Sequence, residues 1–144
     1  TSSDGTTWTS RTSGTSKTFV RVTYGNSIFV MVGQSGTIMT SSDGTSWDNR
    51  TSGTSNGLYG VTYGNNTFVI SGSSGTILTS SDGTSWDNRT SGTTEQLSGV
   101  TYGNSTYVIV GNSGTILTSS DNGTTWTSRT SGTTQHLYGV TYSQ

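Results

Sequence analysis

The sequence predicts an all-β protein, a β-propeller arc of four-stranded antiparallel blades. Three observations favour this fold class. A 39-residue segment recurs along the whole chain, each copy contains four short runs of β-branched and aromatic residues, and each copy carries one tryptophan at the same place. Gly and Asn separate the runs, and no stretch has the periodicity of an amphipathic helix. Four strands in about 40 residues is the pattern of one propeller blade.

The repeat begins with Thr-Ser-Ser-Asp at residues 1, 40, 79 and 118, a spacing of 39. The last copy contains one inserted residue, Asn122, and stops at residue 144. Because a blade buries its apolar faces only against other blades, we treat the chain as a single repeat domain. We expect whole blades at 19–53, 58–92 and 97–132, and partial blades at 1–14 and 137–144.

The four strands of a blade are clearest in the third copy. The first run, 97–102, ends at a Gly-Asn turn signal. The second run, 106–110, is apolar on both of its faces, so we expect both faces of this strand to be buried. A Gly-rich turn leads to the third run, 115–119, and an Asp-Asn-Gly turn leads to the fourth, 125–130. A β-solenoid is the main alternative, because Thr-rich repeats also suit stacked sheets, but its coils are usually shorter.

The partial copies are predicted to contain strands as well. Residues 1–14 should supply the end of a third strand and a whole fourth strand, and residues 137–142 a first strand. The strands that belong between them are missing, so both ends of the arc should expose strand edges and apolar faces. We therefore expect this chain to be completed by more of its own kind. Either it is part of a longer parent chain, or several copies form a homo-oligomer that completes the propeller.

Composition excludes several classes of function. Six basic and seven acidic residues give a net charge of −1, which leaves no electrostatic footprint for nucleic acid. No run of 18 apolar residues is present, so we expect no membrane span. The absence of Cys excludes disulfides and thiolate metal sites. Thr, Ser and Gly make up 80 of the 144 residues, a composition that favours an extracellular or cell-surface setting.

A turn motif returns in every copy. Residues 119–126 read S-x-D-x-G-x-T-W, and the other copies are one residue shorter. The motif resembles the Asp-box, also called the bacterial neuraminidase repeat, which lies between the third and fourth strands of a blade. In such a turn Asp accepts backbone N–H bonds, Gly adopts a positive φ and Trp forms an apolar plug. The structural residues are Asp4, Trp8, Asp43, Trp47, Asp82, Trp86, Asp121, Gly123 and Trp126.

The resemblance raises the question of catalysis, because the Asp-box family includes sialidases and other glycoside hydrolases. Sialidases use an arginine triad, a Tyr nucleophile with a Glu partner, and a further acid. This chain has one Glu, Glu95, and one His, His136, with no visible partner. Its repeated arginines should ring the perimeter: Arg11, Arg50, Arg89 and Arg129. We therefore expect no enzyme, no catalytic residue, no metal and no cofactor.

Variation between the copies indicates where a ligand could bind. It concentrates in the loops between blades and in the loops between second and third strands, which share one face of a propeller. Hydroxyls, amides and aromatic rings there could hold a neutral sugar. The candidate ligand-binding residues are Lys17, Phe19, Gln34, Asn56, Tyr59, Ser73, Glu95, Gln96, Asn112, Gln135, His136 and Tyr138.

The sequence leaves three functions open. The first is a non-enzymatic binding or scaffold module with weak glycan or cell-surface protein sites repeated per blade. The second is a structural element that self-assembles into a ring or filament. The third is a fragment of an Asp-box glycoside hydrolase. Asp-box propellers also occur in a photosystem II assembly factor family, to which nothing here beyond the box is specific.

Overall fold

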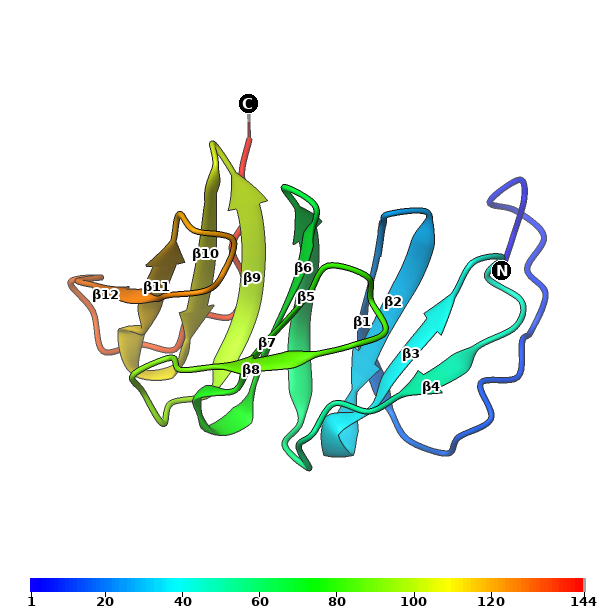
Figure 1. Ribbon diagram of the computed structural model, residues 1–144, viewed down its shortest axis with the longest axis horizontal. Coiled ribbons are helices and arrows are strands. Elements are labelled where there is room, and N and C mark those ends of the chain that lie inside the picture. The colour runs from blue at the N-terminus through cyan, green and yellow to red at the C-terminus, as the bar shows by residue number, and fades with distance from the viewer. Residues whose placement is uncertain (144) are drawn as a thin grey trace.

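The chain forms three four-stranded antiparallel sheets that stand side by side in an arc (Figure 1). The structure is a computed structural model, and it describes residues 1–143. Each sheet keeps its strands in chain order. This is the predicted all-β architecture, with the three blades at 19–50, 58–89 and 97–129.

The strands recur at equivalent places in the three blades. Blade 1 consists of β1 (Phe19–Gly25), β2 (Ile28–Gly33), β3 (Ile38–Ser41) and β4 (Asp48–Arg50). Blade 2 consists of β5 (Leu58–Gly64), β6 (Thr67–Gly72), β7 (Ile77–Ser80) and β8 (Asp87–Arg89). Blade 3 consists of β9 (Leu97–Gly103), β10 (Thr106–Gly111), β11 (Ile116–Ser119) and β12 (Thr127–Arg129).

The hairpin between the first and second strands fixes the register of each blade. In blade 1 the turn residues Asn26 and Ser27 have φ of 47° and 62°, and the turns of the other two blades also have two positive φ values. Two positive φ values define a type I′ turn, whose twist matches that of the flanking strands. The register that follows pairs Gly25 with Ile28, the residues that flank the turn.

A single turn of 3₁₀ helix, three residues long, lies between the second and third strands of each blade. These turns are η1 (Gln34–Gly36), η2 (Ser73–Gly75) and η3 (Asn112–Gly114). In η1 the N–H of Thr37 donates to the carbonyl of Gln34 at 3.2 Å, which closes the reversal in four residues. Within residues 1–143 no helix is long and apolar enough to cross a membrane.

The core lies between the sheets. Between blades 1 and 2, Val30, Val32 and Ile38 of one sheet meet Phe68 and Ile70 of the next. Between blades 2 and 3, Val69 and Ile77 of blade 2 meet Tyr107 and the aliphatic residues Ile109 and Leu117 of blade 3. The second strand is largely buried, as expected, and in β6 five of six residues are buried. All four residues of the third strands β3 and β7 are buried as well. At both interfaces the earlier blade therefore contributes aliphatic residues, and the later blade contributes aliphatic and aromatic ones.

The blades approach closely because a tyrosine of one inner strand covers a glycine of the preceding one. Tyr63 of β5 lies on Gly25 of β1, and a Cβ atom at that glycine would overlap the ring. Tyr102 covers Gly64 in the same way. The phenol of Tyr107 adds a bond across the second interface, because it donates toward the carbonyl of Thr67 at 2.9 Å. Burial raises the pKa of this phenol above its ordinary value.

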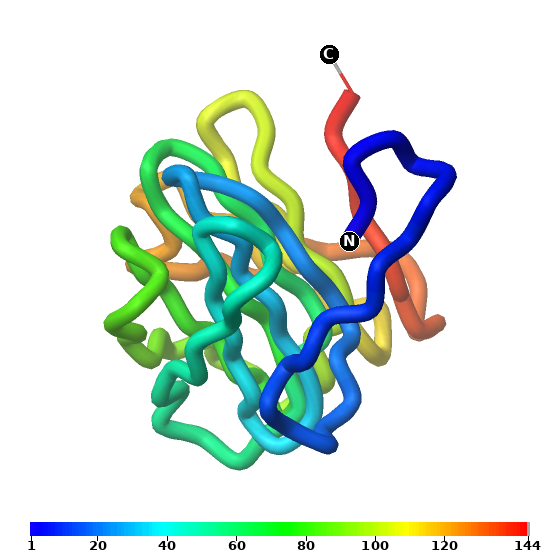
Figure 2. The backbone as a smooth tube through the Cα atoms, turned by 90° about the vertical axis from the view of Figure 1, so that its right-hand side faces the viewer, coloured from blue at the N-terminus to red at the C-terminus, as the bar shows by residue number. Residues whose placement is uncertain are grey.

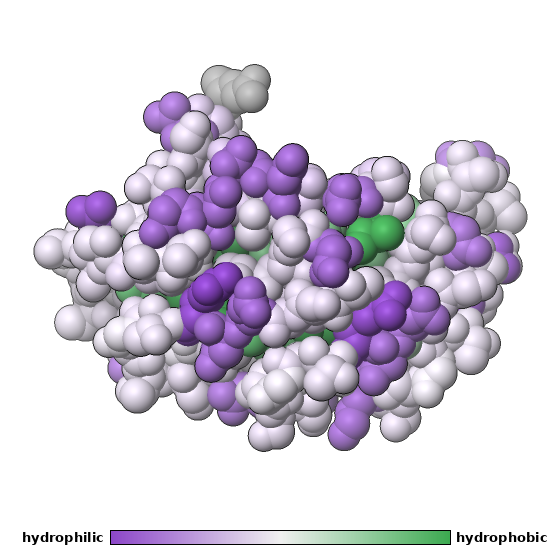
Figure 3. Space-filling model, viewed as in Figure 1, coloured by the Kyte–Doolittle hydropathy of each residue, from purple (hydrophilic) through white to green (hydrophobic). Residues whose placement is uncertain are grey.

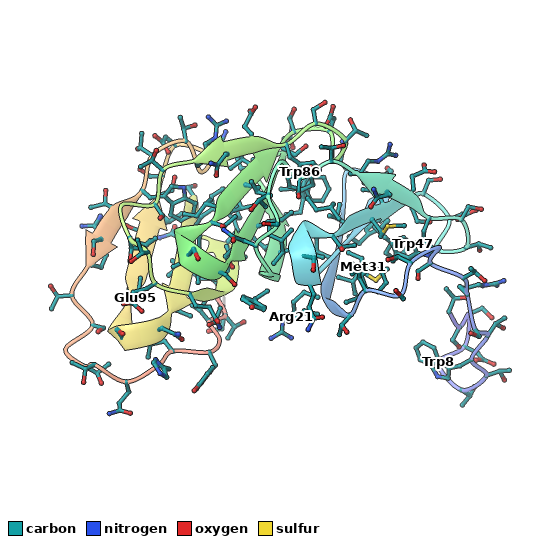
Figure 4. The ribbon with its side chains drawn as sticks, turned by 90° about the horizontal axis from the view of Figure 1, so that it is seen from below. Trp8, Arg21, Met31, Trp47, Trp86 and Glu95 are labelled. Carbon is teal, nitrogen blue, oxygen red and sulfur yellow. The ribbon has the colours of Figure 1, made fainter. Side chains whose placement is uncertain are left out.

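The partial copies at the two ends contain no assigned strand, contrary to expectation. At the N-terminus one rung remains, in which Thr1 and Thr9 exchange backbone bonds of 2.7 and 2.8 Å. The strand that would extend this rung on the other side is absent from residues 1–18, so no ladder forms. Trp8 is consequently 72% exposed and covers no core residue (Figure 4). The N-terminal segment that carries it runs along the outside of the molecule (Figure 2).

The C-terminal segment, residues 137–143, takes the place of a further inner strand without forming a ladder. Tyr142 lies on Gly103 as Tyr102 lies on Gly64, and the N–H of Leu137 donates to the carbonyl of Gly111 at 3.0 Å. A strand to pair with this segment is lacking in the described part of the chain.

The close approach of the blades makes the glycine at the end of each inner strand irreplaceable. We expect Gly64→Ala to lower the free energy of unfolding by about 1–3 kcal/mol, because the added methyl group overlaps the ring of Tyr102. Gly139→Ala is the matched control, since a Cβ atom there meets nothing within 4 Å. Urea unfolding followed by tryptophan fluorescence measures both, and equal stabilities would contradict this packing rule.

Candidate functional site

Two sets of loops meet at one end of the blades. The loops between blades and the 3₁₀ turns lie at this end, and the hairpins between first and second strands lie at the other (Figure 1). Backbone bonds join the two sets: the N–H of Ser73 donates to Gly57, and that of Asn112 donates to Gln96, both at 2.9 Å. We call this end the loop face. Figure 3 shows a mostly neutral to hydrophilic molecular surface in its view of the molecule.

Three open grooves, one per blade, are cut into the loop face. The blade-1 groove is lined by Ser35–Thr37 and residues 49–54, and the blade-2 groove by Ser74–Thr76 and residues 88–94. The blade-3 groove is lined by Ser113–Thr115 and residues 128–134. Each groove thus combines a Ser-Gly-Thr stretch at the 3₁₀ turn with the loop after the fourth strand.

The walls of the grooves are held rigidly by their own backbone. A Cβ atom on Gly36 would collide with the carbonyl of Thr54, and Gly36 has a φ of 68°. Both facts require glycine there, because L-residues rarely adopt this conformation. Ser52 holds the opposite loop, since its hydroxyl donates to the carbonyl of Thr54 at 3.1 Å. The same arrangement recurs in the other two grooves, so each hydroxyl has a fixed position.

One arginine of the outermost strand lines each groove. The Nε atoms of Arg50, Arg89 and Arg129 each donate at 2.8 Å to a threonine hydroxyl of the third strand. Arg50 and Arg89 also pair with Asp48 and Asp87, at 3.2 and 3.1 Å. The arginines lie one per blade, as the sequence indicates, and these exposed pairs contribute about 0–1 kcal/mol each.

The sequence-predicted binding residues reach the grooves only in part. Lys17 lines the blade-1 groove, and Asn56 lines the blade-2 groove, where its amide donates to the hydroxyl of Thr76 at 2.9 Å. Ser73 donates to the phenol of Tyr59 at 3.1 Å. Phe19 lies elsewhere, in a depression beside Met31 and Trp47 on the exposed side of blade 1.

The remaining candidates make local contacts on the loop face. Gln96 donates its amide to the hydroxyl of Ser98 at 3.3 Å. The N–H groups of Gln34 and Asn112 donate to carbonyls of the interblade loops, and the carbonyl of Gln135 accepts from Gly114. These residues therefore tie the loops together through their backbone atoms.

Glu95 and His136, which the sequence offers as isolated residues, both contact Ser113. The hydroxyl of Ser113 donates to Glu95 Oε2, and its backbone N–H donates to His136 Nδ1, each at 3.2 Å. Tyr138 is 70% exposed and stands edge-on to His136 with a centroid distance of 6.2 Å. The imidazole does not bond the hydroxyl, as a base that activates a serine nucleophile must.

Sequence reasoning missed the residues that line most of each groove. Differences between the copies do not indicate these residues, because the lining is nearly the same in all three grooves. The missed signal is the pair of segments Ser-Gly-Thr and Thr-Ser-Gly-Thr, which recur in every blade and are polar without pairing in a strand.

The aspartate turns, at residues 41–47, 80–86 and 119–126, join the third strand of each blade to the fourth (Figure 1). In the second of them, Asp82 Oδ1 accepts the N–H groups of Thr84 and Ser85 at 2.8 and 2.9 Å. The expected backbone bonds are therefore present. The indole of Trp86 donates to the carbonyl of Gly83 at 3.2 Å and packs against the core (Figure 4).

These hydrogen bonds stabilise the carboxylate form of each aspartate. Bonds from Ser85 and Thr84 hold the pKa of Asp82 well below its usual range, and bonds from Ser46 and Thr45 lower that of Asp43. In the last turn, the hydroxyl and the N–H of Thr125 lower the pKa of Asp121 to about 2. No group of three His, Cys, Asp or Glu side chains that could hold a metal occurs within residues 1–143.

Comparison with known proteins identifies the family. The model of the DUF6242 β-propeller domain matches residues 22–137, and the chain therefore belongs to this family. The structure titled "YCF48 bound to D1 peptide" is 22% identical with a TM-score of 0.67, over 79% of this chain and 40% of that one. YCF48 from Cyanidioschyzon merolae is 18% identical with a TM-score of 0.65, over 78% and 37%. No curated protein matches.

These structural likenesses concern the fold alone, because the identities are low. The chain spans about two fifths of the length of these solved propellers. The family and the likeness to YCF48 together establish that the three sheets are propeller blades.

The depressed pKa values make the stability of the fold depend on acid. An aspartate whose pKa is lower in the folded state stabilises it above the unfolded pKa of about 3.9, and this contribution is lost as the pH falls through the folded value. We expect the free energy of unfolding to drop between about pH 5 and pH 2, and to drop less in Asp82→Asn.

The matched control is Asp87→Asn, which removes a carboxylate that accepts a bond from Arg89 and none from the backbone. Urea unfolding at a series of pH values measures the slope for each variant. An unchanged slope in Asp82→Asn, or the same change in both variants, would contradict the assignment to the aspartate turn.

Proposed function

We propose that this member of the DUF6242 β-propeller family is part of a non-enzymatic propeller that binds polar ligands on its loop face and acts as a scaffold. The observation that carries the proposal is the set of three equivalent open grooves, one on each blade. Repetition of a weak site on a rigid frame gives avidity for a ligand that spans several sites.

The chemistry of the grooves favours binding over turnover. Their side chains are mainly hydroxyls and amides, and in blades 1 and 2 an aspartate offsets the charge of the arginine. General acid–base catalysis requires a positioned proton donor or acceptor, and nucleophilic catalysis an activated nucleophile. Ser113, whose hydroxyl bonds Glu95, has neither an imidazole nor an amine on that hydroxyl.

Two classes of ligand suit such grooves. Fixed hydroxyls and the amide of Asn56 can exchange hydrogen bonds with a neutral glycan, and Trp86 lines the same groove. A polypeptide is the second class, which the solved complex of YCF48 with D1 peptide supports by analogy of fold. The low content of charged residues suits a module that is secreted or displayed on a cell surface.

The aspartate turns are, in this proposal, Asp-boxes with a structural role. Their carboxylates accept backbone N–H bonds at Oδ1, which assigns each of them to its own turn. This engagement argues against the alternative of a glycoside hydrolase fragment, which needs two carboxyl groups facing one bond.

Self-assembly is a second candidate function, favoured by the uncovered aromatic face of blade 1. Val22 and Tyr24 of β1 are 57% and 58% exposed, whereas the equivalent Val61 and Tyr63 pack against blade 1. The ring of Tyr24 lies tilted against that of Phe29 with a centroid distance of 4.8 Å, as Tyr63 lies against Phe68 at 4.5 Å, so the exposed face of blade 1 already has the arrangement of a covered one. Either further blades of a parent chain or a second copy would cover it.

Ligand binding on the loop face is tested with arrays of neutral oligosaccharides and of peptides, followed by titration of the best ligand. We expect Asn56→Ala to weaken binding about threefold to tenfold, the value of one hydrogen bond. Ser85→Ala, in an aspartate turn, is the control and should bind as the parent does. Binding that is lost equally in both variants, or absent from both arrays, would overturn the proposal.

Self-assembly through blade 1 is tested by sedimentation velocity. We expect the unsubstituted chain to sediment as larger species at micromolar concentration. Tyr24→Lys should shift it toward the monomer, because a charge on an apolar face opposes burial of that face. Ser85→Lys serves as the control. An unsubstituted chain that remains a 15 kDa monomer would refute self-assembly through blade 1.

A further inference from the structure

The three grooves differ in charge at one equivalent position of the outermost strand. The residue two positions before each groove arginine is Asp48 in blade 1 and Asp87 in blade 2, but Thr127 in blade 3. Thr127 pairs with Thr118 of β11 just as Asp48 pairs with Thr40 of β3, so the substituted residue occupies the equivalent position in its blade. The blade-3 groove therefore carries an arginine without an aspartate beside it. The carboxylate that lies next to this groove, that of Glu95, accepts a bond from the hydroxyl of Ser113.

The guanidinium of Arg129 is nevertheless held in place. Its Nε donates to the hydroxyl of Thr118 at 2.8 Å, the same length as the bonds of Arg50 and Arg89. Its terminal nitrogens form no ion pair within residues 1–143. One edge of the guanidinium is thus fixed by the protein while the rest is available, an arrangement that reduces the entropy cost of binding an anion.

The rest of the blade-3 groove consists of small polar residues. Its lining contains only Ser, Thr and Gly besides Arg129. The blade-2 groove differs, because Leu78 and Trp86 also line it. A groove with no apolar or aromatic wall offers little to an apolar side chain and much to a ligand that carries hydroxyl groups.

We propose that the blade-3 groove binds the carboxylate of an acidic saccharide, a uronic acid residue, with Arg129 as the anchor. A planar guanidinium and a carboxylate can form two parallel hydrogen bonds. The hydroxyls of Ser128 and Thr130 are then donors and acceptors for the sugar ring. This inference rests on the proposed function of the loop face and adds the ligand class for one of its grooves.

Arg11 does not form a second site of this kind. It too has a threonine, Thr9, two positions before it, and its Nε donates to Thr1 at 2.9 Å. The depression beside it is lined by Phe19, Met31 and Trp47, and no 3₁₀ turn faces it. Arg129 differs from Arg11 because a groove lined by hydroxyl groups lies beside it.

The test uses the full chain labelled with ¹⁵N and titrated with sodium D-glucuronate, D-glucose or sodium acetate. We expect saturable shifts of the amide signals of Gly114, Ser131 and Gly132 with glucuronate, at millimolar affinity because the pair is exposed. Glucose and acetate should each bind at least about fivefold more weakly, since each lacks one of the two groups recognised. Added salt should weaken the glucuronate response.

The other blades provide matched variants. Thr127→Asp recreates the Asp-x-Arg pair of blades 1 and 2, so it should fold and should weaken glucuronate binding at least tenfold. Asp87→Thr removes that pair from blade 2 and should create a second set of shifts at Gly75, Ser91 and Gly92. The two variants move the site in opposite directions without altering a core residue.

Several results would overturn the inference. Glucuronate binding that survives Thr127→Asp would show that the open guanidinium is not the determinant. Equal affinity for acetate would show that the groove recognises an anion and no saccharide. If neutral oligosaccharides or peptides bind the loop face while glucuronate does not, this inference fails and the proposed function stands. If none of these ligands binds, both fail.

Discussion

The close contact between inner strands is the constraint on which the rest of the structure depends. Only 26% of the residues are hydrophobic, so the chain cannot build a thick core within one blade. It gains its apolar burial by bringing neighbouring sheets so close that Tyr63 rests directly on Gly25. The contact works because glycine removes the side chain that would separate the strands. A blade is therefore stable only beside another blade, as in other repeat proteins.

The same packing places the grooves. Because the inner strands are fixed against one another, the loops at their ends keep a constant offset from blade to blade. Each loop between blades can then donate or accept backbone bonds with a 3₁₀ turn, as Gly57 does with Ser73. Small residues suffice for these walls, which explains how a chain that is more than half Thr, Ser and Gly can hold its hydroxyls in fixed positions. The binding surface is thus a consequence of how the blades pack.

Repetition gives the molecule near-identical sites, and single substitutions then make them different. Asp48 and Asp87 pair with the arginines of two grooves, while Thr127 leaves Arg129 of the third without such a pair. Glu95 and His136 add a polar cluster at Ser113 in blade 3 alone. A propeller with such differences can offer chemically distinct sites on one face while its fold stays uniform, because these residues lie outside the core.

The sequence by itself determined the local features of this protein: the period, the strands of the whole blades, and the aspartate turns whose bonds span two to four residues. These depend on residue types that are close in the chain, so pattern and spacing suffice to predict them. Only the tertiary structure decided which residues line a groove, that Trp8 is exposed, and that Glu95 and His136 meet at Ser113, 18 and 23 residues away. Such contacts depend on how far one blade is displaced from the next, a distance set by the tyrosine and glycine packing of the inner strands and not by the spacing of residues within a repeat.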